Sequence, residues 1–208
     1  MSGYILYGYP ASGSGAVEVA LVAANIPFEM KDLDPDAGEL ESEAFLAINP
    51  RGQVPTLIHP DGSVITEVPA ILLHLADAHP GCGLAPPPGS SARAQHDRWL
   101  AFAHANCYEG VLRLFYSDRY TTDPTQAEPV SKAALAYVIR HLNMMADGMG
   151  TGPFMFGEYP MAVDYLVWIM TTWLVDEDLS DLDPKILALG EALAARNDLK
   201  EVAARNTE

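Results

Sequence analysis

The stretch that decides the fold is Asn49-Pro50-Arg51-Gly52-Gln53-Val54-Pro55-Thr56-Leu57. Its first Pro and Gly end any preceding helix, and the apolar residues that follow predict a short strand over residues 54–58. Asp61-Gly62 is typical of a tight hairpin turn, so residues 63–66 should form the antiparallel partner strand. Pro55 has no N–H to donate to a ladder, which places it at the beginning of its strand. We therefore expect a β-hairpin here.

The residues on either side of this hairpin alternate between strand and helix patterns. Upstream, strands are predicted over residues 4–7 and 27–33, and helices over residues 16–24 and 39–48. Downstream, residues 67–78 have the apolar spacing of a helix. The resulting order, βαβαββα, with a helical crossover between parallel strands and a terminal hairpin, is a thioredoxin-like layout.

The composition changes at residues 80–91, where nine of twelve residues are Pro, Gly or Ser, which is typical of a linker. Beyond it, apolar residues recur with helical spacing. The clearest stripes are Leu135, Val138, Ile139, Leu142 and Met145; Leu166, Ile169, Met170, Trp173 and Leu174; and Ile186, Leu189 and Leu193. We predict an α/β plus all-α protein, with a thioredoxin-like domain over residues 1–80, a linker over 81–91 and a helical bundle over 92–208.

The charge balance restricts the possible partners. The 208 residues contain 12 Lys and Arg against 28 Asp and Glu, a net charge of −16. Such a surface repels phosphate backbones and anionic lipids, so we expect no nucleic-acid partner and no membrane partner. The two cysteines, Cys82 and Cys107, have no zinc-like spacing with histidines, so we expect no metal site. The sparse cysteines and the absence of a signal-peptide pattern favour a cytoplasmic protein.

A second segment, Thr66-Glu67-Val68-Pro69-Ala70-Ile71-Leu72-Leu73-His74-Leu75-Ala76-Asp77, follows the hairpin. Together with residues 49–57 it resembles the glutathione S-transferase family, which has NPxGxVPxL, then Glu or Gln before Ser, then AIxxYLxD. The resemblance extends over essentially the whole chain, including the Pro-rich linker and the helical second half. It implies an enzyme that uses glutathione as co-substrate and forms a homodimer with its active sites along the interface.

The resemblance also implies which residues bind glutathione. The bond between Val54 and Pro55 would be cis, exposing the main-chain N–H and C=O of Val54 to an extended tripeptide. Gln53 would reach towards the glycyl end. Glu67 would take the α-amino group, while N–H groups at the start of its helix bind the γ-glutamyl carboxylate. Considered separately, a structural proline and a glutamate favoured by the helix dipole would explain the same residues.

Val68 departs from the family pattern, which has Ser or Thr at this position. The hydroxyl of that residue also binds the γ-glutamyl carboxylate, so in this chain only the backbone N–H of Val68 remains. Hydrogen bonds to charged groups contribute about 1.5–3 kcal/mol. The loss would therefore weaken glutathione binding about ten- to a hundredfold unless another donor replaces the hydroxyl.

The thiol-activating residue of the family lies in the loop after the first strand, and here that loop offers Ser12 and Ser14. A hydroxyl donor and a helix N-terminus can together stabilise a thiolate. Both serines are equally well explained as N-caps of the first helix, and the sequence leaves that alternative open. A tyrosine-type mechanism is the lesser option, because the nearest candidate, Tyr9, directly precedes Pro10.

The electrophile pocket of the family lies between this loop and the first helices of the second half. We place it at Tyr108, Leu112 and Phe115. Further candidates are Trp99, Phe102, Tyr116 and Trp173. Most of these side chains have helical spacing, which equally suits the core of a helical bundle.

These expectations combine into a glutathione transferase that conjugates the glutathione thiolate to an apolar electrophile. Glutathione-dependent isomerases, peroxidases and reductases of the same fold are alternatives. A non-catalytic ligand-binding or interaction module is another, favoured by Val68 and Met161. In the family's capping box, Ser or Thr stands at the position of Met161. The Asp three residues later, here Asp164, accepts the backbone N–H of that capping residue. We expect Asp164 to cap the backbone without that hydroxyl.

Overall fold

The computed structural model describes residues 3–175 and 179–207. Its first half contains a four-stranded mixed sheet in the order β2-β1-β3-β4. The strands are β1 (Tyr4–Gly8), β2 (Phe28–Asp32), β3 (Thr56–Ile58) and β4 (Val64–Thr66). β1 runs parallel to β2 and antiparallel to β3, and β3 and β4 form an antiparallel hairpin. The predicted thioredoxin-like layout is confirmed.

Three helices accompany the sheet: α1 (Ser14–Ala23), α2 (Glu43–Leu46) and α3 (Val68–Ala78). The helix predicted over residues 39–48 is divided into a 3-10 turn (Glu39–Glu41) and α2. The division occurs at Ser42, whose backbone is extended and whose Oγ accepts the N–H of Phe45 at 3.2 Å. Capping by Ser thus begins a new helix where the sequence pattern predicted a continuous one.

The second half is helical, as predicted. α4 (Ser91–Phe102), a π-helical segment (Ala103–Tyr108) and α5 (Glu109–Phe115) follow one another without a break. Two 3-10 turns (Ser117–Tyr120 and Pro124–Gln126) lead to α6 (Ala127–Gly148), α7 (Ala162–Thr171), α9 (Pro184–Ala194) and α10 (Lys200–Thr207).

The predicted apolar stripes differ in how completely they are buried. Ile186, Leu189 and Leu193 on α9 are fully buried. Leu135 and Ile139 on α6 are half-buried and pack against the core. The stripe on α7 ends early, because the helix stops at Thr171 and its last two members, Trp173 and Leu174, lie in the turn that follows.

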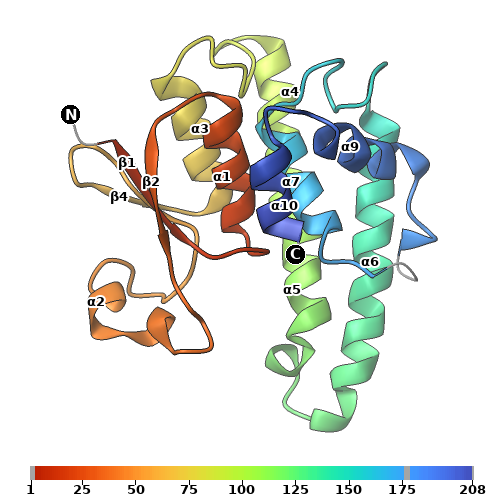
Figure 1. Ribbon diagram of the computed structural model, residues 1–208. Helices are drawn as coiled ribbons and strands as arrows, with labels where there is room; N and C mark the ends of the chain where they lie inside the picture. The colour runs from red at the N-terminus through yellow and green to blue at the C-terminus, as the bar shows by residue number, and fades with distance from the viewer. Residues whose placement is uncertain (1–2, 176–178, 208) are drawn as a thin grey trace.

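α1 lies between the sheet and the helical half, next to α7 and α10 (Figure 1). Every residue from Ser14 to Leu21 is buried, so this short helix is surrounded on all sides. Gly15 allows the close packing. A Cβ there would lie 2.6 Å from Oδ1 of Asn206 and 2.7 Å from Cδ1 of Ile169, distances that side-chain atoms do not tolerate.

A polar cluster joins α10 to the first half. Arg205 Nε donates to Glu18 Oε1 on α1 at 2.9 Å, and the same guanidinium pairs with Asp32 at the end of β2. Asn206 Nδ2 donates to the other carboxylate oxygen of Glu18 at 2.9 Å. Glu18 is 6% exposed, and a buried carboxylate without such donors would be strongly destabilising. The helix nearest the C-terminus therefore completes the surroundings of α1.

α7 begins at a buried aspartate. Asp164 is fully buried, and its two carboxylate oxygens accept the N–H groups of Met161 and Met155, each at 2.8 Å. The Met161 side chain makes no capping hydrogen bond. Asp164 therefore caps the backbone alone, as the sequence predicted. Burial raises the pKa of Asp164 to about 7, although the backbone donors work in the opposite direction.

Candidate functional site

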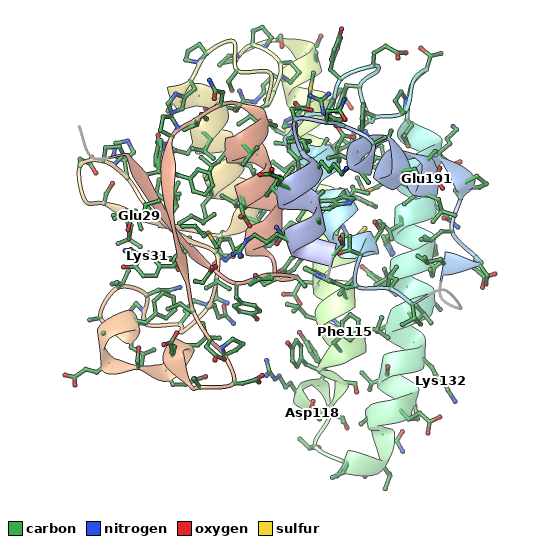
Figure 2. All side chains as sticks on the ribbon, viewed as in Figure 1. Glu29, Lys31, Phe115, Asp118, Lys132 and Glu191 are labelled. Carbon is green, nitrogen blue, oxygen red and sulfur yellow. The ribbon has the colours of Figure 1, made fainter. Side chains whose placement is uncertain are left out.

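A cleft of about 670 Å³ is lined by residues from both halves of the chain. Its sheet side consists of the loop after β1, residues 49–55 and the start of α3. Its helical side runs along residues 104–119, including Phe115 at the end of α5 (Figure 2), and also includes Trp173. The predicted site residues that line it are Ser12, Gln53, Val54, Pro55, Glu67, Val68, Tyr108, Leu112 and Phe115.

The first wall of the cleft is the turn before β3. The Val54–Pro55 bond is cis, and β3 begins only at Thr56, so Val54 lies outside the ladder between β1 and β3. The turn is held from beneath by Asn49, which is 5% exposed. Its Nδ2 donates to the C=O of Gln53 at 2.8 Å and to Oγ1 of Thr56 at 3.0 Å. The backbone of Val54 is thus presented to the cleft on a fixed support.

Glu67 stands at the N-cap of α3 with φ of +67°, a left-handed conformation that is costly for a residue with a side chain. Its Oε1 accepts a hydrogen bond from Arg51 Nη1 at 2.7 Å, and its Oε2 is 3.8 Å from Nε2 of His104. The Glu67 carboxylate and the first N–H groups of α3 thus lie at the same end of the helix. That combination suits a ligand carrying both an ammonium and a carboxylate group.

Ser12 and Ser14 occupy different layers of the loop after β1. Ser12 is 6% exposed and lines the cleft, whereas Ser14 is fully buried beneath it. Their hydroxyl oxygens are 2.7 Å apart. Gly8 makes room for Ser14, because a Cβ on Gly8 would collide with the Ser14 side chain. Of the two serines, Ser12 is the one that lines the cleft.

The hydrogen bonds of the two serines determine which hydroxyl could donate its proton to a ligand. Ser12 Oγ donates to the C=O of Tyr9 at 2.7 Å, and Ser14 Oγ lies 3.1 Å from the same oxygen, within donating distance. A serine hydroxyl has one proton. If Ser12 turns its proton towards the cleft, Ser14 can still satisfy the Tyr9 carbonyl. Ser14 is therefore placed to support Ser12 in donating to a ligand.

Two residues from the π-helical segment face the loop. Tyr108 approaches Gly13 so closely that a Cβ on Gly13 would collide with the phenol oxygen. Burial raises the pKa of Tyr108 to about 12, so its hydroxyl keeps its proton at neutral pH and can donate to a ligand. His104 forms a tilted ring contact with Tyr108, with centroids 5.2 Å apart. Burial lowers the pKa of His104, which favours the neutral imidazole.

Arg51 and His104 reach Glu67 although the sequence analysis assigned neither of them to the site. One signal was available for His104, which is four residues from Tyr108 and so shares its helix face. The π-helical segment that carries both residues is a geometry that often occurs at functional sites. Arg51 is 16 positions from Glu67, and no periodic pattern indicates such a contact.

The wider set of pocket candidates separates into two groups. Tyr116 and Trp173 line the cleft with the three residues chosen from the sequence. Trp99 is 8% exposed within the core, and Phe102 packs against the core beside His141, so neither lines the cleft. The Tyr108 and Trp173 rings meet edge to face, with centroids 5.6 Å apart. The helical wall is therefore aromatic but not uniformly apolar.

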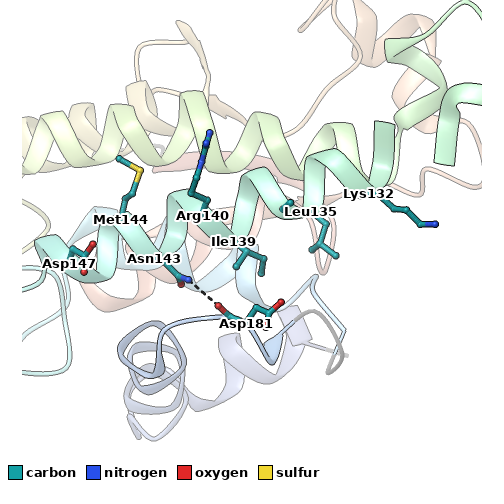
Figure 3. Close-up of a pocket in the computed structure, with 9 residues that line it drawn as sticks. Lys132, Leu135, Ile139, Arg140, Asn143, Met144, Asp147 and Asp181 are labelled. Carbon is teal, nitrogen blue, oxygen red and sulfur yellow. Dashed lines mark hydrogen bonds between the residues drawn. The ribbon is translucent and has the colours of Figure 1, made fainter. Parts of the chain in front are cut away.

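A second hollow of about 650 Å³ lies along the outer face of α6, next to Asp181 (Figure 3). Asn143 Nδ2 donates to the C=O of Asp181 at 3.0 Å across it. The described residues place no strained backbone and no exposed helix start there, so the cleft beside Ser12 is the candidate site. Across residues 3–175 and 179–207, no group of three or more His, Cys, Asp or Glu side chains could hold a metal ion. No helix in the same part of the chain is long and apolar enough to cross a bilayer.

Comparison with known sequences identifies both a matching family model and a curated relative of nearly the same length. A family model described as "Glutathione S-transferase, N-terminal domain" matches residues 2–77. The curated "Uncharacterized GST-like protein YncG" of Escherichia coli (strain K12) is 31% identical over 203 residues, which is 97% of each chain.

Solved structures extend the similarity to the whole fold. A glutathione transferase from Methylococcus capsulatus strain Bath is similar with a TM-score of 0.80 and 30% identity, over 97% of both chains. A sphingomonad glutathione S-transferase complexed with glutathione is similar with a TM-score of 0.79 and 26% identity. That match covers 96% of this chain and 97% of the other. The similarity thus includes both the sheet side and the helical side of the cleft.

Proposed function

Because the chain belongs to the glutathione S-transferase family, we propose that it binds glutathione in the cleft and transfers the glutathione thiolate to an electrophile. One observation carries the proposal. Ser12, Val54 and Glu67 come from three separate segments and line one cleft. They offer a hydroxyl, an unpaired strand position and a helix start. A relative of the same fold is complexed with glutathione, which supports this assignment.

In this proposal glutathione lies as an added strand beside the turn before β3. The N–H and C=O of Val54 pair with the cysteinyl backbone, and Gln53 reaches towards the glycyl carboxylate. The Glu67 carboxylate binds the α-amino group, and the start of α3 binds the γ-glutamyl carboxylate. Arg51 donates to the Glu67 carboxylate at 2.7 Å, and His104 lies 3.8 Å from its other oxygen.

The thiol then points towards Ser12 and the start of α1. An unperturbed thiol with a pKa of about 8.5 is mostly protonated at neutral pH. Lowering that pKa by about two units requires about 2.7 kcal/mol of preferential stabilisation of the thiolate. The Ser12 hydroxyl and the N-terminus of α1 supply it in this scheme, and the protonated Tyr108 hydroxyl lies next to the same loop.

Titration calorimetry with glutathione, followed by a rate assay with chlorodinitrobenzene, tests the proposal. We expect saturable binding and a conjugation rate above that of the uncatalysed reaction. Glu67→Ala should weaken glutathione binding about tenfold, because a charged partner of the α-amino group is lost. Glu191→Ala, on an exposed glutamate of α9 (Figure 2), is the matched control and should bind normally. Wild-type protein that neither binds glutathione nor speeds the reaction would refute the proposal.

Val68 provides a gain-of-function prediction. It is the first residue of α3, 2% exposed, and it lines the cleft. Val68→Thr replaces one methyl group of the side chain by a hydroxyl. The added hydrogen-bond donor should lower the Kd for glutathione about tenfold. Val64→Thr, on the exposed face of β4, is the control for adding a hydroxyl elsewhere. Equal affinities of wild type and Val68→Thr in calorimetry would show that another donor already replaces this hydroxyl.

A non-catalytic glutathione-binding module is the second candidate function, and Val68 is the observation that favours it. Measurable binding without turnover on a panel of electrophiles would support the module. Chemistry by a loop cysteine is less favoured, because residues 9–14 contain none and Cys107 is fully buried with a pKa raised to about 12 by burial. The homodimer and the cytoplasmic location stay predictions.

A further inference from the structure

The helical wall of the cleft suggests which electrophile it accepts, an inference that rests on the proposed function. Phe115 is 52% exposed and Tyr116 is 40% exposed, although both are large apolar or aromatic side chains. Tyr108 and Trp173 line the cleft too, so the helical half contributes four aromatic side chains to its lining. Exposed aromatic faces bind flat rings by stacking or edge-to-face contact. The wall is therefore suited to an aromatic substrate.

Arg119 places a positive charge at the same wall. Its guanidinium carbon lies 4.1 Å from the centroid of the Tyr116 ring, and the residue is exposed and lines the cleft. Stacking on an aromatic face leaves the N–H edge of a guanidinium free, and that edge matches a carboxylate with two parallel hydrogen bonds. The ring of Tyr116 thus holds Arg119 in an orientation that suits an anion.

Of the two arginines that line the cleft, Arg119 is the one without a carboxylate partner among the described ion pairs. None of the ion pairs found in residues 3–175 and 179–207 includes it, in a chain with a net charge of −16. The other cleft arginine, Arg51, is paired with Glu67. Two further carboxylates line the cleft, Glu41 and Glu109. Glu41 is exposed and belongs to the first half of the chain, whereas Glu109 belongs to the helical half. Glu109 is 3.9 Å from Arg113 and 3.5 Å from the Tyr120 hydroxyl, which partly offset its charge. His104 has its pKa lowered by burial and adds little positive charge.

We propose that the second substrate is a flat aromatic electrophile that carries a carboxylate, and that Arg119 is the residue that selects it. The ring packs against Phe115 and Tyr116, and the carboxylate pairs with the guanidinium of Arg119. For an activated aryl halide, the thiolate sulfur donates an electron pair to the halogen-bearing carbon and forms the C–S bond. The C–halogen bond breaks, the halide leaves with its electron pair, and the thiol proton passes to water.

The experiment compares chlorodinitrobenzene with its carboxylated analogue, chlorodinitrobenzoate, each as kcat/KM divided by its uncatalysed rate constant. We expect the wild type to favour the benzoate. Arg119→Gln should lower the benzoate-to-benzene ratio about five- to tenfold, and Arg119→Lys should lower it less. The ratio in the wild type should also fall as salt is added, because the contact is exposed. Arg98→Gln is the control, since Arg98 stacks on Trp99 at 4.2 Å outside the cleft and should leave the ratio unchanged.

Two results would overturn the inference and leave conjugation intact. One is a wild type without preference for the benzoate, and the other is an Arg119→Gln variant with an unchanged ratio. Absence of turnover with both substrates would instead refute the proposed function. In that case, tryptophan fluorescence quenching by unreactive dinitrobenzoate still tests the contact. Equal affinities of wild type and Arg119→Gln for that ligand would then dismiss the role of Arg119.

Discussion

Asp164→Ala should lower the free energy of unfolding by about 2–5 kcal/mol, the largest effect on stability that we expect from one substitution. The carboxylate accepts the N–H groups of Met155 and Met161 and is fully buried. Its removal leaves two backbone donors without partners in the core, each costing about 1–3 kcal/mol. Met161 has no hydroxyl that could compensate. Chemical denaturation, followed by circular dichroism, measures the loss.

The control for this substitution is Asp147→Ala, which removes an exposed aspartate from α6 and should change the free energy of unfolding by less than about 0.5 kcal/mol. If Asp164→Ala were as stable as this control, the cap of α7 would not depend on Asp164. Activity should decrease only as far as the folded fraction decreases, because Asp164 does not line the cleft.

The pH dependence of the free energy of unfolding tests the role of Asp164 in a second way. Its pKa is raised to about 7 in the folded chain, so the folded state holds the proton more tightly than the unfolded state. Such a group contributes most to the free energy of unfolding below its unfolded pKa of about 3.9. That contribution is lost as the pH rises through about 7. Asp164→Asn does not titrate. The stability of the wild type relative to Asp164→Asn should therefore fall between about pH 4 and pH 7.

Ser12→Ala should reduce kcat/KM for conjugation about ten- to a hundredfold. A hydrogen bond to a charged group contributes about 1.5–3 kcal/mol, and Ser12 is the loop serine that lines the cleft. Without it the thiol of bound glutathione should have a higher pKa. The pH profile of kcat/KM should therefore move to higher pH, which loss of folding alone would not cause.

Ser14→Ala is the matched comparison, because Ser14 lies two residues away and is fully buried. This variant removes the acceptor of the Tyr9 N–H and a second donor to the Tyr9 carbonyl. We expect a larger decrease in stability and a smaller decrease in kcat/KM than for Ser12→Ala. Wild-type activity in both variants would rule out the serine mechanism.

Local patterns in the sequence were sufficient for much of the fold. The hairpin follows from Asp61-Gly62 and from Pro55, and the burial of Ile186, Leu189 and Leu193 follows from their helical spacing. The break at Ser42 was missed, because the capping preference of one serine competes with an otherwise helical pattern.

The site was less predictable, because its contacts connect residues that no local pattern relates. Pro55 and Glu67 could be proposed from their motif, but the ion pair between Arg51 and Glu67 depends on how two loops meet. The sequence left Ser12 and Ser14 equivalent. Their difference arises from Gly8, which allows the Ser14 side chain to lie beneath β1 and leaves Ser12 at the surface of the cleft.

The link between Glu18 and Arg205 has a consequence for how the chain folds during its synthesis. The two residues are 187 positions apart, and ribosomes add roughly 5–20 residues per second, so α1 exists for about 10–40 s before Arg205 is added. Throughout that interval the Glu18 carboxylate has neither of its α10 donors, and Gly15 lacks its contact with Asn206. The newly made first half therefore exposes an unfinished surface while it is still attached to the ribosome. That surface is completed only when α10 docks and supplies both donors to Glu18.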